Sequence, residues 1–237
     1  MSKTQFILLF TVVVFCLLQN RTIAQQPLLD STDKKVFAKV GITSIILTTA
    51  TYFADEPIRD HFQSNTTPLL NKYGNTMDVL GDYRTLLGLN ALSYAGGWLF
   101  KDETLKNTSL NAFKSIISTT ILTGGAKEVF GRARPYTEKG SVHFRPFPVF
   151  SQDSDDYRSL PSAHTSMSFA LFTPFAEEYT RLLYLVPVSI GISRIYQDEH
   201  WASDVLIGAT IGFFTGYFFQ QKNRNIEVSL NKIVVKF

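Results

Sequence analysis

Cysteine is almost absent from this sequence of 237 residues. The single cysteine, Cys16, lies in an apolar N-terminal segment. The rest of the chain therefore offers no disulfide framework, no zinc–thiolate site and no cysteine nucleophile. Charged residues are also sparse, at 18%, but a hydrophobic content of 45% is close to that of ordinary folded proteins and excludes intrinsic disorder. The length suits one domain with short appendages.

A concentrated excess of basic charge is missing as well. The formal net charge is +3, and 21 basic residues oppose 20 acidic ones once Lys3 and Arg21 of the N-terminal segment are set aside. A nucleic-acid-binding surface requires basic side chains gathered on one face. The sequence therefore predicts no nucleic-acid partner.

Residues 1–24 have the pattern of a signal peptide. Lys3 precedes an apolar run of 13 residues at 6–18, and Thr22 and Ala24 offer a cleavage pair. The run is short for a membrane span and no stop-transfer pattern follows it. We expect export to the cell envelope, with an uncleaved membrane anchor as the alternative.

Uncharged runs as long as a membrane span, which needs about 20 predominantly apolar residues, are also missing. The longest uncharged runs, 40–54, 85–100 and 205–221, have 15, 16 and 17 residues. Gly208, Gly212 and Gly216 recur at a spacing that permits close helix packing in membranes and in soluble bundles alike. Three spans after a cleaved leader would also place the motifs described below in the cytoplasm. The pattern favours a periplasmic protein, soluble or membrane-associated, with an integral membrane protein as the alternative.

Apolar stretches of helical length between polar breaks predict an all-α domain over residues 25–221, a compact bundle of about six helices. These helices are expected near 33–54, 76–100, 106–131, 162–180, 182–197 and 201–221. Residues 135–160 lack periodicity, and an irregular segment of that length is usually a functional loop. The tail 222–237 alternates at 226–230 and predicts a short strand.

Two cationic side chains stand out at the end of the third predicted helix. Lys127 and Arg134 are seven residues apart, which places them on one helical face, and Pro135 ends the helix. Two cations on one face suit an oxyanion. A solvated basic helix end is the ordinary alternative.

A second motif opens the next helix with the sequence Pro161-Ser162-Ala163-His164. Proline and serine are common first residues of helices, so a plain helix cap explains them by itself. The free backbone amides of a helix N-terminus also bind anions, and His164 would stand beside such an anion as a proton donor.

A third motif contains Arg194, His200 and Asp204. Residues four apart are neighbours on a helix, so Asp204 can orient the His200 ring and leave its other nitrogen as a base or nucleophile. The planar guanidinium of Arg194 suits an oxyanion. A surface His–Asp pair is the ordinary alternative, and Trp201 is expected to pack in the core.

Together, the patterns Lys-x6-Arg-Pro, Pro-Ser-Ala-His and Ser-Arg-x5-His-x3-Asp resemble the signature of the type 2 phosphatidic acid phosphatase and vanadium haloperoxidase superfamily. The three motifs occur in the expected order over 127–204, and the following apolar helix extends the resemblance to about residue 221. Residues 25–126 resemble the family only in being helical. Ala163 stands where the family more often has glycine, but its backbone amide remains.

The resemblance implies a phosphatase that forms a phosphohistidine. His200 would attack phosphorus, Asp204 would hold the His200 ring, and His164 would protonate the leaving oxygen and then activate water. The groups implied to bind the phosphate oxygens are Lys127, Arg134, Ser162, Arg194 and the amide of Ala163. The resemblance implies no metal and no other cofactor.

The predicted function is thus metal-independent hydrolysis of a phosphomonoester or pyrophosphate, with an envelope lipid as the favoured substrate. A periplasmic non-specific acid phosphatase is the main alternative, and it would act on a small phosphoester. A vanadium-dependent haloperoxidase is less favoured, because such enzymes are generally much larger, and a non-catalytic relic is disfavoured by the intact His164, His200 and Asp204.

Overall fold

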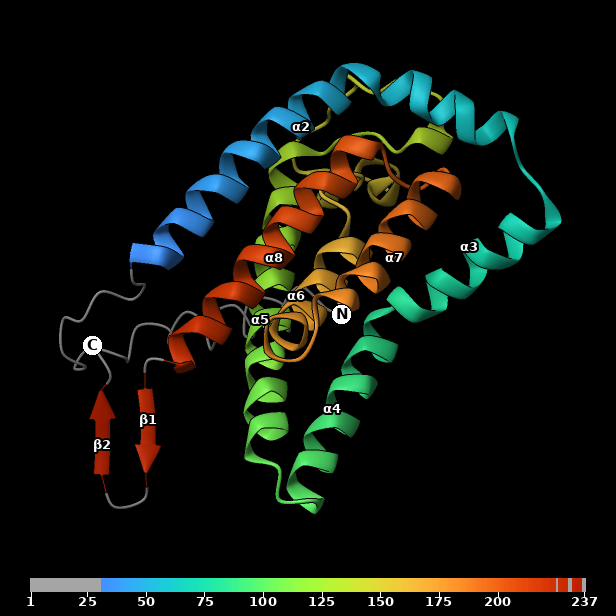
Figure 1. Ribbon diagram of the computed structural model, residues 1–237. Helices are drawn as coiled ribbons and strands as arrows, with labels where there is room; N and C mark the ends of the chain where they lie inside the picture. Colours follow the sequence, from blue (N-terminus) through green and yellow to red (C-terminus); the bar gives the residue numbers. More distant parts are fainter. Residues whose placement is uncertain (1–30, 225, 230–231, 236–237) are drawn as a thin grey trace.

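The computed structural model describes residues 31–224, 226–229 and 232–235 (Figure 1). The predicted signal peptide lies outside these residues. Seven α-helices occur in the described part of the chain: α2 (Ser31–Ser64), α3 (Pro68–Gly81), α4 (Tyr83–Leu99), α5 (Glu103–Phe130), α6 (Ala163–Glu178), α7 (Leu185–Tyr196) and α8 (Ala202–Arg224). The predicted all-α bundle is confirmed.

Helices α5, α6 and α8 pack against one another at the centre of the bundle. Helix α4 covers α5, α2 runs along α8, and α3 lies against α7 (Figure 1). After α8, strands β1 (Ile226–Ser229) and β2 (Lys232–Val235) pair antiparallel, with Ile226 opposite Val235. The first strand coincides with the alternating stretch of the sequence.

The predicted helix boundaries are wrong in two places. Helix α2 continues through Pro57 to Ser64, where the sequence pattern ends a helix at 54. Contacts on both sides of the proline hold this helix: Glu56 accepts a hydrogen bond from the Ser141 amide at 2.7 Å, and Arg59 forms an ion pair with Asp198 at 2.6 Å. Tertiary contacts thus offset the backbone hydrogen bond that proline removes.

The second difference is a break inside the predicted helix 76–100. Asp82 has extended backbone angles and its carboxylate accepts a hydrogen bond from the Arg84 amide at 2.9 Å, which caps the start of α4. Helix α3 begins earlier than predicted, at Pro68, with Thr67 as its cap. An aspartate cap inside an apolar stretch leaves the hydrophobic period almost unchanged, so periodicity alone misses it.

The predicted irregular segment is ordered by short 3₁₀ turns and by backbone contacts with the end of α5. The turns are η1 (Pro135–Thr137), η2 (Pro148–Phe150) and η3 (Ser154–Tyr157). Gly131 ends α5 with φ at +58°, and its carbonyl accepts a 2.6 Å hydrogen bond from the Arg145 amide. Residues 131–162, which connect α5 to α6 and include the predicted irregular segment 135–160, are called the cap loop below.

The glycine stripe of α8 lets its backbone touch α6. A side-chain carbon added at Gly208 would lie 2.6 Å from the Ser162 carbonyl oxygen, and one added at Gly212 would lie 2.1 Å from that of Ser166. Neither distance is possible for a real carbon atom. The stripe therefore fixes how closely α8 approaches the helix that begins with the second motif.

We expect Gly212→Ala to destabilise the fold by about 1–3 kcal/mol, because the methyl group must push α6 and α8 apart. Gly124→Ala in α5 is the matched control, since nothing lies within 4 Å of the added carbon. The control should be neutral or stabilising by up to ~1 kcal/mol. Thermal unfolding of both variants measures the difference, and equal melting temperatures would contradict the packing role.

Candidate active site

The three sequence motifs meet at one end of the bundle, where the cap loop connects α5 to α6 (Figure 1). Helix ends supply almost all of them: the last turn of α5, the start of α6, the last turn of α7 and the start of α8. The predicted site residues at this end are Lys127, Arg134, Ser162, Ala163, His164, Arg194, His200 and Asp204. The charges of these residues act on one another. Positive charge on Arg134, Lys127 and Arg194 lowers the pKa of His200, and positive charge on His164 acts in the same direction.

His200 is buried, with only 3% of its surface exposed. Its Nδ1 atom lies 4.0 Å from Oδ2 of Asp204, which is longer than a hydrogen bond. Among the described residues, no group hydrogen-bonds to this nitrogen. The two side chains are neighbours as the sequence spacing predicts, but the orienting hydrogen bond is not formed in this state.

Asp204 is instead held by three other groups. Its Oδ1 accepts from Nη1 of Arg132 at 2.7 Å, and its Oδ2 accepts from Ser159 Oγ at 2.5 Å and from the Trp201 amide at 3.0 Å. The side chain of Trp201 is buried, as predicted. The carboxylate is therefore fixed in place with Oδ2 on the Nδ1 side of the His200 ring.

Three cations line the same space. The charged end of Lys127 lies deep in the protein and donates to the Arg158 carbonyl oxygen rather than to a carboxylate. Arg134 pairs with Glu199, and Nη2 of Arg194 lies 3.5 Å from the same carboxylate. Among the described residues, the Nε atom of Arg194 has no hydrogen-bond partner. Donor capacity at this end of the bundle thus exceeds what the protein itself uses.

Asp78 on α3 links two predicted site residues. One of its oxygens pairs with Arg194 and lies 3.4 Å from Nε2 of His164. The Asp78 side chain is 45% exposed, so it stands at the solvent edge of the site. Sequence analysis misses Asp78, because nothing in the α3 sequence marks it as a partner of a histidine 86 residues later.

The start of α6 presents backbone donors. Its first helical bond runs from the Ser166 amide to the Ser162 carbonyl at 3.0 Å, so the amides of Ala163 and His164 precede the hydrogen-bonded turns. The Ser162 amide itself donates to the Asp204 carbonyl at 3.1 Å, and its hydroxyl accepts from Thr165 at 3.0 Å. This terminus suits an anion.

Burial and the surrounding positive charge lower the pKa values of the basic groups. The pKa of His164 falls to about 4, first because the ring is desolvated and then because Arg194 is near. Burial and the charge of Arg134 lower the pKa of Lys127 to about 7. Burial, then Arg134 and Lys127, hold the pKa of His200 well below its ordinary value. A bound oxyanion would raise all three pKa values, since it supplies the missing negative charge.

Sequence analysis also misses two residues that hold Asp204 in place, Arg132 directly and Asp55 through Arg132. Arg132 lies between the two basic residues of the first motif, and it is buried and ion-paired with Asp55 and Asp204 at 2.8 and 2.7 Å. Asp55 comes from α2, far away in the chain. No local pattern distinguishes a buried arginine of this kind from a solvated one.

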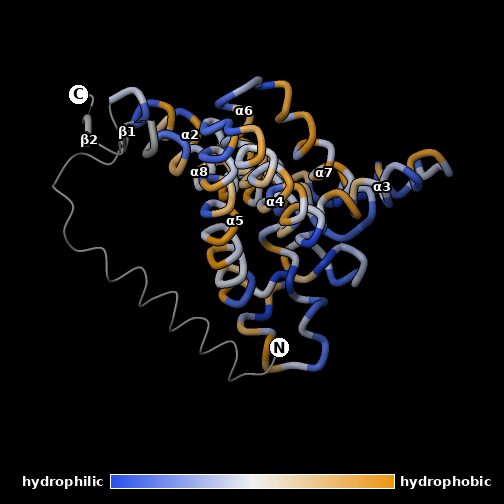
Figure 2. The backbone as a smooth tube through the Cα atoms, turned by 90° about the horizontal axis from the view of Figure 1, so that it is seen from below, coloured by the Kyte–Doolittle hydropathy of each residue, from blue (hydrophilic) through white to orange (hydrophobic). Residues whose placement is uncertain are grey.

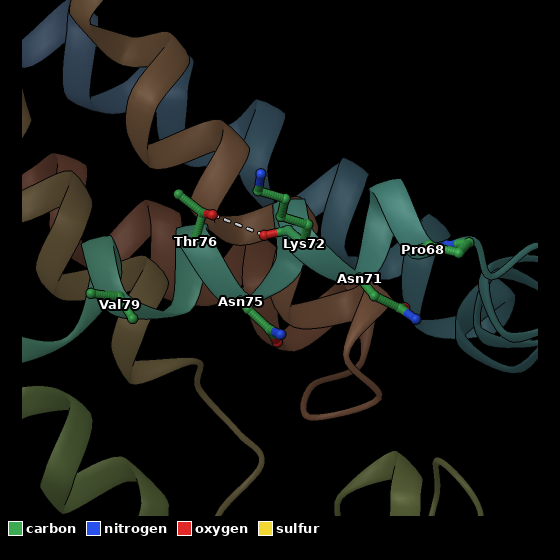
Figure 3. A pocket seen from close by; sticks show the side chains of 6 residues that line it. All are labelled: Pro68, Asn71, Lys72, Asn75, Thr76 and Val79. Atoms are coloured by element: carbon green, nitrogen blue, oxygen red, sulfur yellow. Dashed lines mark hydrogen bonds between the residues drawn. The ribbon is translucent and has the colours of Figure 1, made fainter.

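The described residues contain no cluster of three or more histidine, cysteine or acidic side chains arranged for a metal ion. A depression of about 690 Å³ lies elsewhere, along one face of α3. Figure 3 shows its lining, which contains none of the predicted site residues: Pro68, Asn71, Lys72, Asn75, Thr76 and Val79. The hydroxyl of Thr76 donates within its own helix, and we assign this groove no role in the chemistry.

The fold is a helical bundle that gathers cations and two histidines at one end, an arrangement suited to an oxyanion. The model of the PAP2 superfamily matches residues 109–227, about half of the chain. The chain belongs to the PAP2 superfamily. All three sequence motifs, which span residues 127–204, fall within the matched residues.

Curated relatives are named as lipid phosphatases. The chain is 35% identical over 102 residues to a lipid A 1-phosphatase of Porphyromonas gingivalis, covering 40% of this chain and 19% of that protein. It is 25% identical over 159 residues to a lipid A 1-phosphatase of Rhizobium etli, covering 60% and 67%. A probable lipid phosphate phosphatase of Arabidopsis thaliana is 31% identical over 139 residues, covering 44% of each chain. The chain thus spans only part of these relatives.

Solved structures share the fold. A transmembrane PAP2-type phosphatidylglycerolphosphate phosphatase from Bacillus subtilis superposes with a TM-score of 0.62 at 22% identity, over 81% of this chain and 97% of that one. LpxE of Aquifex aeolicus superposes with a TM-score of 0.55 at 24% identity, over 70% and 94%. The helical arrangement outside the matched residues is therefore shared as well.

Anion binding at this site should weaken as Lys127 loses its proton. Lys127 carries its charge below its pKa of about 7 and is neutral above it, so sulfate affinity should fall by up to about tenfold per pH unit above pH 7. Sulfate keeps a constant charge in this range. Calorimetric titration between pH 6 and 9 measures the effect. Lys127→Arg should remove this pH dependence, since arginine stays charged, and an unchanged dependence in Lys127→Gln would contradict the assignment.

Proposed function

We propose that this protein is a phosphatase that removes phosphate from a membrane lipid through a phosphohistidine on His200. The observation that carries the proposal is the gathering of three cations and two histidines at one end of the bundle, where, among the described residues, Nε of Arg194 has no hydrogen-bond partner. Such a site is complete only with a multiply charged oxyanion. The names of the curated relatives support a lipid phosphate as the substrate class.

The proposed first step transfers the phosphoryl group to His200. Asp204 lies on the Nδ1 side of the ring, which leaves Nε2 to attack phosphorus. The bond from phosphorus to the lipid oxygen breaks, its electron pair stays on that oxygen, and His164 supplies the proton. As the His200 ring becomes positive, Asp204 is close enough to stabilise the charge.

In the second step, water hydrolyses the phosphohistidine. His164, now neutral, takes a proton from the water, whose oxygen attacks phosphorus, and His200 leaves as a neutral ring. Bound phosphate explains how His164 can carry a proton despite a pKa of about 4 in the empty site, because adjacent negative charge raises that pKa. Lys127, Arg134 and Arg194 bind the non-bridging oxygens in this scheme.

The surface of the bundle suits a membrane surrounding. Small polar side chains fill the interior between α5, α6 and α8; examples are Ser115, Thr119 and Thr123, which bond to hydroxyl groups of the facing helices. Large apolar side chains point outward instead, among them Ile45, Leu92, Trp98, Leu122 and Val188. Figure 2 shows the hydrophobic stretches along these helices. This inside-out distribution is typical of helices packed in lipid.

In the part of the chain that the structure describes, two helices are long and apolar enough to cross a membrane, α2 and residues Ala202–Gln221 of α8. Their outward faces and those of α4 and α5 support an integral membrane protein over a soluble acid phosphatase. The end of α2 that carries Asp55 meets the site, so Ser31 lies at the opposite end of the bundle. The site therefore opens on the side of the membrane opposite to the side on which residue 31 lies.

We expect His200→Ala to lose at least about 10⁴-fold in kcat, because no other group can form the covalent intermediate. His164→Ala should lose about 10²–10⁴-fold with a lipid phosphate and much less with p-nitrophenyl phosphate, whose leaving group needs no proton. Phosphate release in EDTA, with and without vanadate, provides the measurement. Equal losses of both substrate classes in His164→Ala would exclude its role as general acid.

The full-length protein should stay in the membrane fraction after extraction with alkaline carbonate and dissolve only in detergent, because its outward apolar faces need a hydrophobic surrounding. Immunoblotting of the two fractions measures the partition. Recovery in the carbonate supernatant, together with turnover of p-nitrophenyl phosphate and not of lipid phosphates, would favour the non-specific acid phosphatase instead.

A further inference from the structure

A buried carboxylate of α2 reaches the start of α8. Asp55 is 1% exposed. Its Oδ1 accepts from the Ser203 amide at 2.9 Å, and its Oδ2 accepts from the Ser203 hydroxyl at 2.5 Å and from Nη2 of Arg132 at 2.8 Å. Ser203 directly precedes Asp204. Helix α2 lies outside the residues 109–227 that match the family.

Arg132 connects this carboxylate to Asp204. Its Nη1 donates to Asp204 at 2.7 Å and to Ser203 at 2.7 Å, and its Nε donates to the Ser141 carbonyl at 2.8 Å. The rings of Tyr52 and Trp201 lie 5.1 and 5.6 Å from the guanidinium carbon. The guanidinium is thus held on its edges and its faces, and its position depends on each of these partners.

We propose that Asp55 is a positioning residue that acts through Arg132 and Ser203 on Asp204. By holding one side of the guanidinium, Asp55 directs the other side at Oδ1 of Asp204, so that Oδ2 remains on the Nδ1 side of His200. The inference rests on the proposed function, because it assigns Asp55 a part in the phosphoryl transfer at His200.

Charge supports the same assignment. The two carboxylates and one guanidinium of this network carry a net single negative charge beside His200. That charge stabilises the His200 ring as it becomes positive during transfer. An asparagine at position 55 leaves the network neutral and frees the guanidinium to shift toward its remaining carboxylate. Phosphoryl transfer to His200 then loses both the correct position of Asp204 and the negative charge beside the ring. The groups proposed to bind phosphate are unchanged.

A purely structural role predicts something different. If Asp55 only fastens α2 to α8, its loss lowers stability but leaves the kcat of the folded enzyme unchanged. Asp33 offers a matched control, because it is also a buried carboxylate of α2 and accepts a hydrogen bond at 3.1 Å from Tyr217 of α8. It lies 22 residues earlier in the helix, about 33 Å away.

The test compares Asp55→Asn, Asp33→Asn and the wild type as full-length proteins in detergent, with a diacylglycerol phosphate as substrate. We expect Asp55→Asn to lower kcat by about 10- to 100-fold with KM nearly unchanged. Asp33→Asn should keep the wild-type kcat and KM, even if its melting temperature falls. Rates are expressed per folded protein, which is measured by size-exclusion chromatography and thermal unfolding.

Ser203→Ala keeps the inference testable if Asp55→Asn does not fold. This variant removes the hydroxyl that Asp55 and Arg132 share without burying an unpaired charge, and it should lower kcat by about fivefold at constant KM. If Asp55→Asn folds and keeps the wild-type kcat, the positioning role is overturned and the proposed function stays intact. If Asp55→Asn does not fold, a wild-type kcat in Ser203→Ala has the same meaning. A wild-type protein without any turnover overturns both.

Discussion

The buried guanidinium of Arg132 is the interaction on which the architecture of the site depends. It joins three parts of the chain that are distant in sequence: Asp55 on α2, the Ser141 carbonyl in the cap loop, and Asp204 on α8. A charge removed from water is tolerated only when its donors are satisfied, and here two carboxylates and a carbonyl do so. The loss of any partner would leave a buried N–H donor of the guanidinium without its acceptor. The contacts of Arg132 therefore hold the cap loop and α2 in fixed positions relative to Asp204, which lies beside His200.

The neighbouring cations are in the opposite situation. Within the described residues, Lys127 bonds to a carbonyl oxygen and to no carboxylate, and Arg194 shares the half-exposed Asp78 with His164. Burial first, and then the positive charge of neighbouring arginines, lowers the pKa values of Lys127 and His164. An oxyanion at this place would supply the missing negative charge. The same end of the bundle thus contains an ion network whose donors are satisfied and, beside it, cations with unused donor capacity.

The distribution of small polar residues explains why hydropathy gives a weak signal for this chain. Helix α5 turns Ser115, Thr119 and Thr123 toward α6 and α8, where hydroxyls bond to one another, and turns Phe113, Ile117, Ile121 and Leu122 outward. In the mean hydropathy of the helix, the polar face and the apolar face offset each other. The same small residues, with Gly212 of α8, permit the close contact that brings the motif-bearing helix ends together.

The sequence alone determined the all-α fold, the order of the three motifs and the placement of Lys127, His164 and His200 at helix ends, because period, caps and spacing are local properties. It predicted the His200–Asp204 neighbourhood, but not that Arg132 and Ser159 hold Asp204. Only the tertiary structure decided that α2 continues through Pro57, that Asp82 divides a helix, and that Asp55 and Asp78 join the site. The break at Asp82 is a local cap that hardly changes the hydrophobic period. The other features depend on contacts between residues far apart in the chain, and such contacts leave no trace in local periodicity.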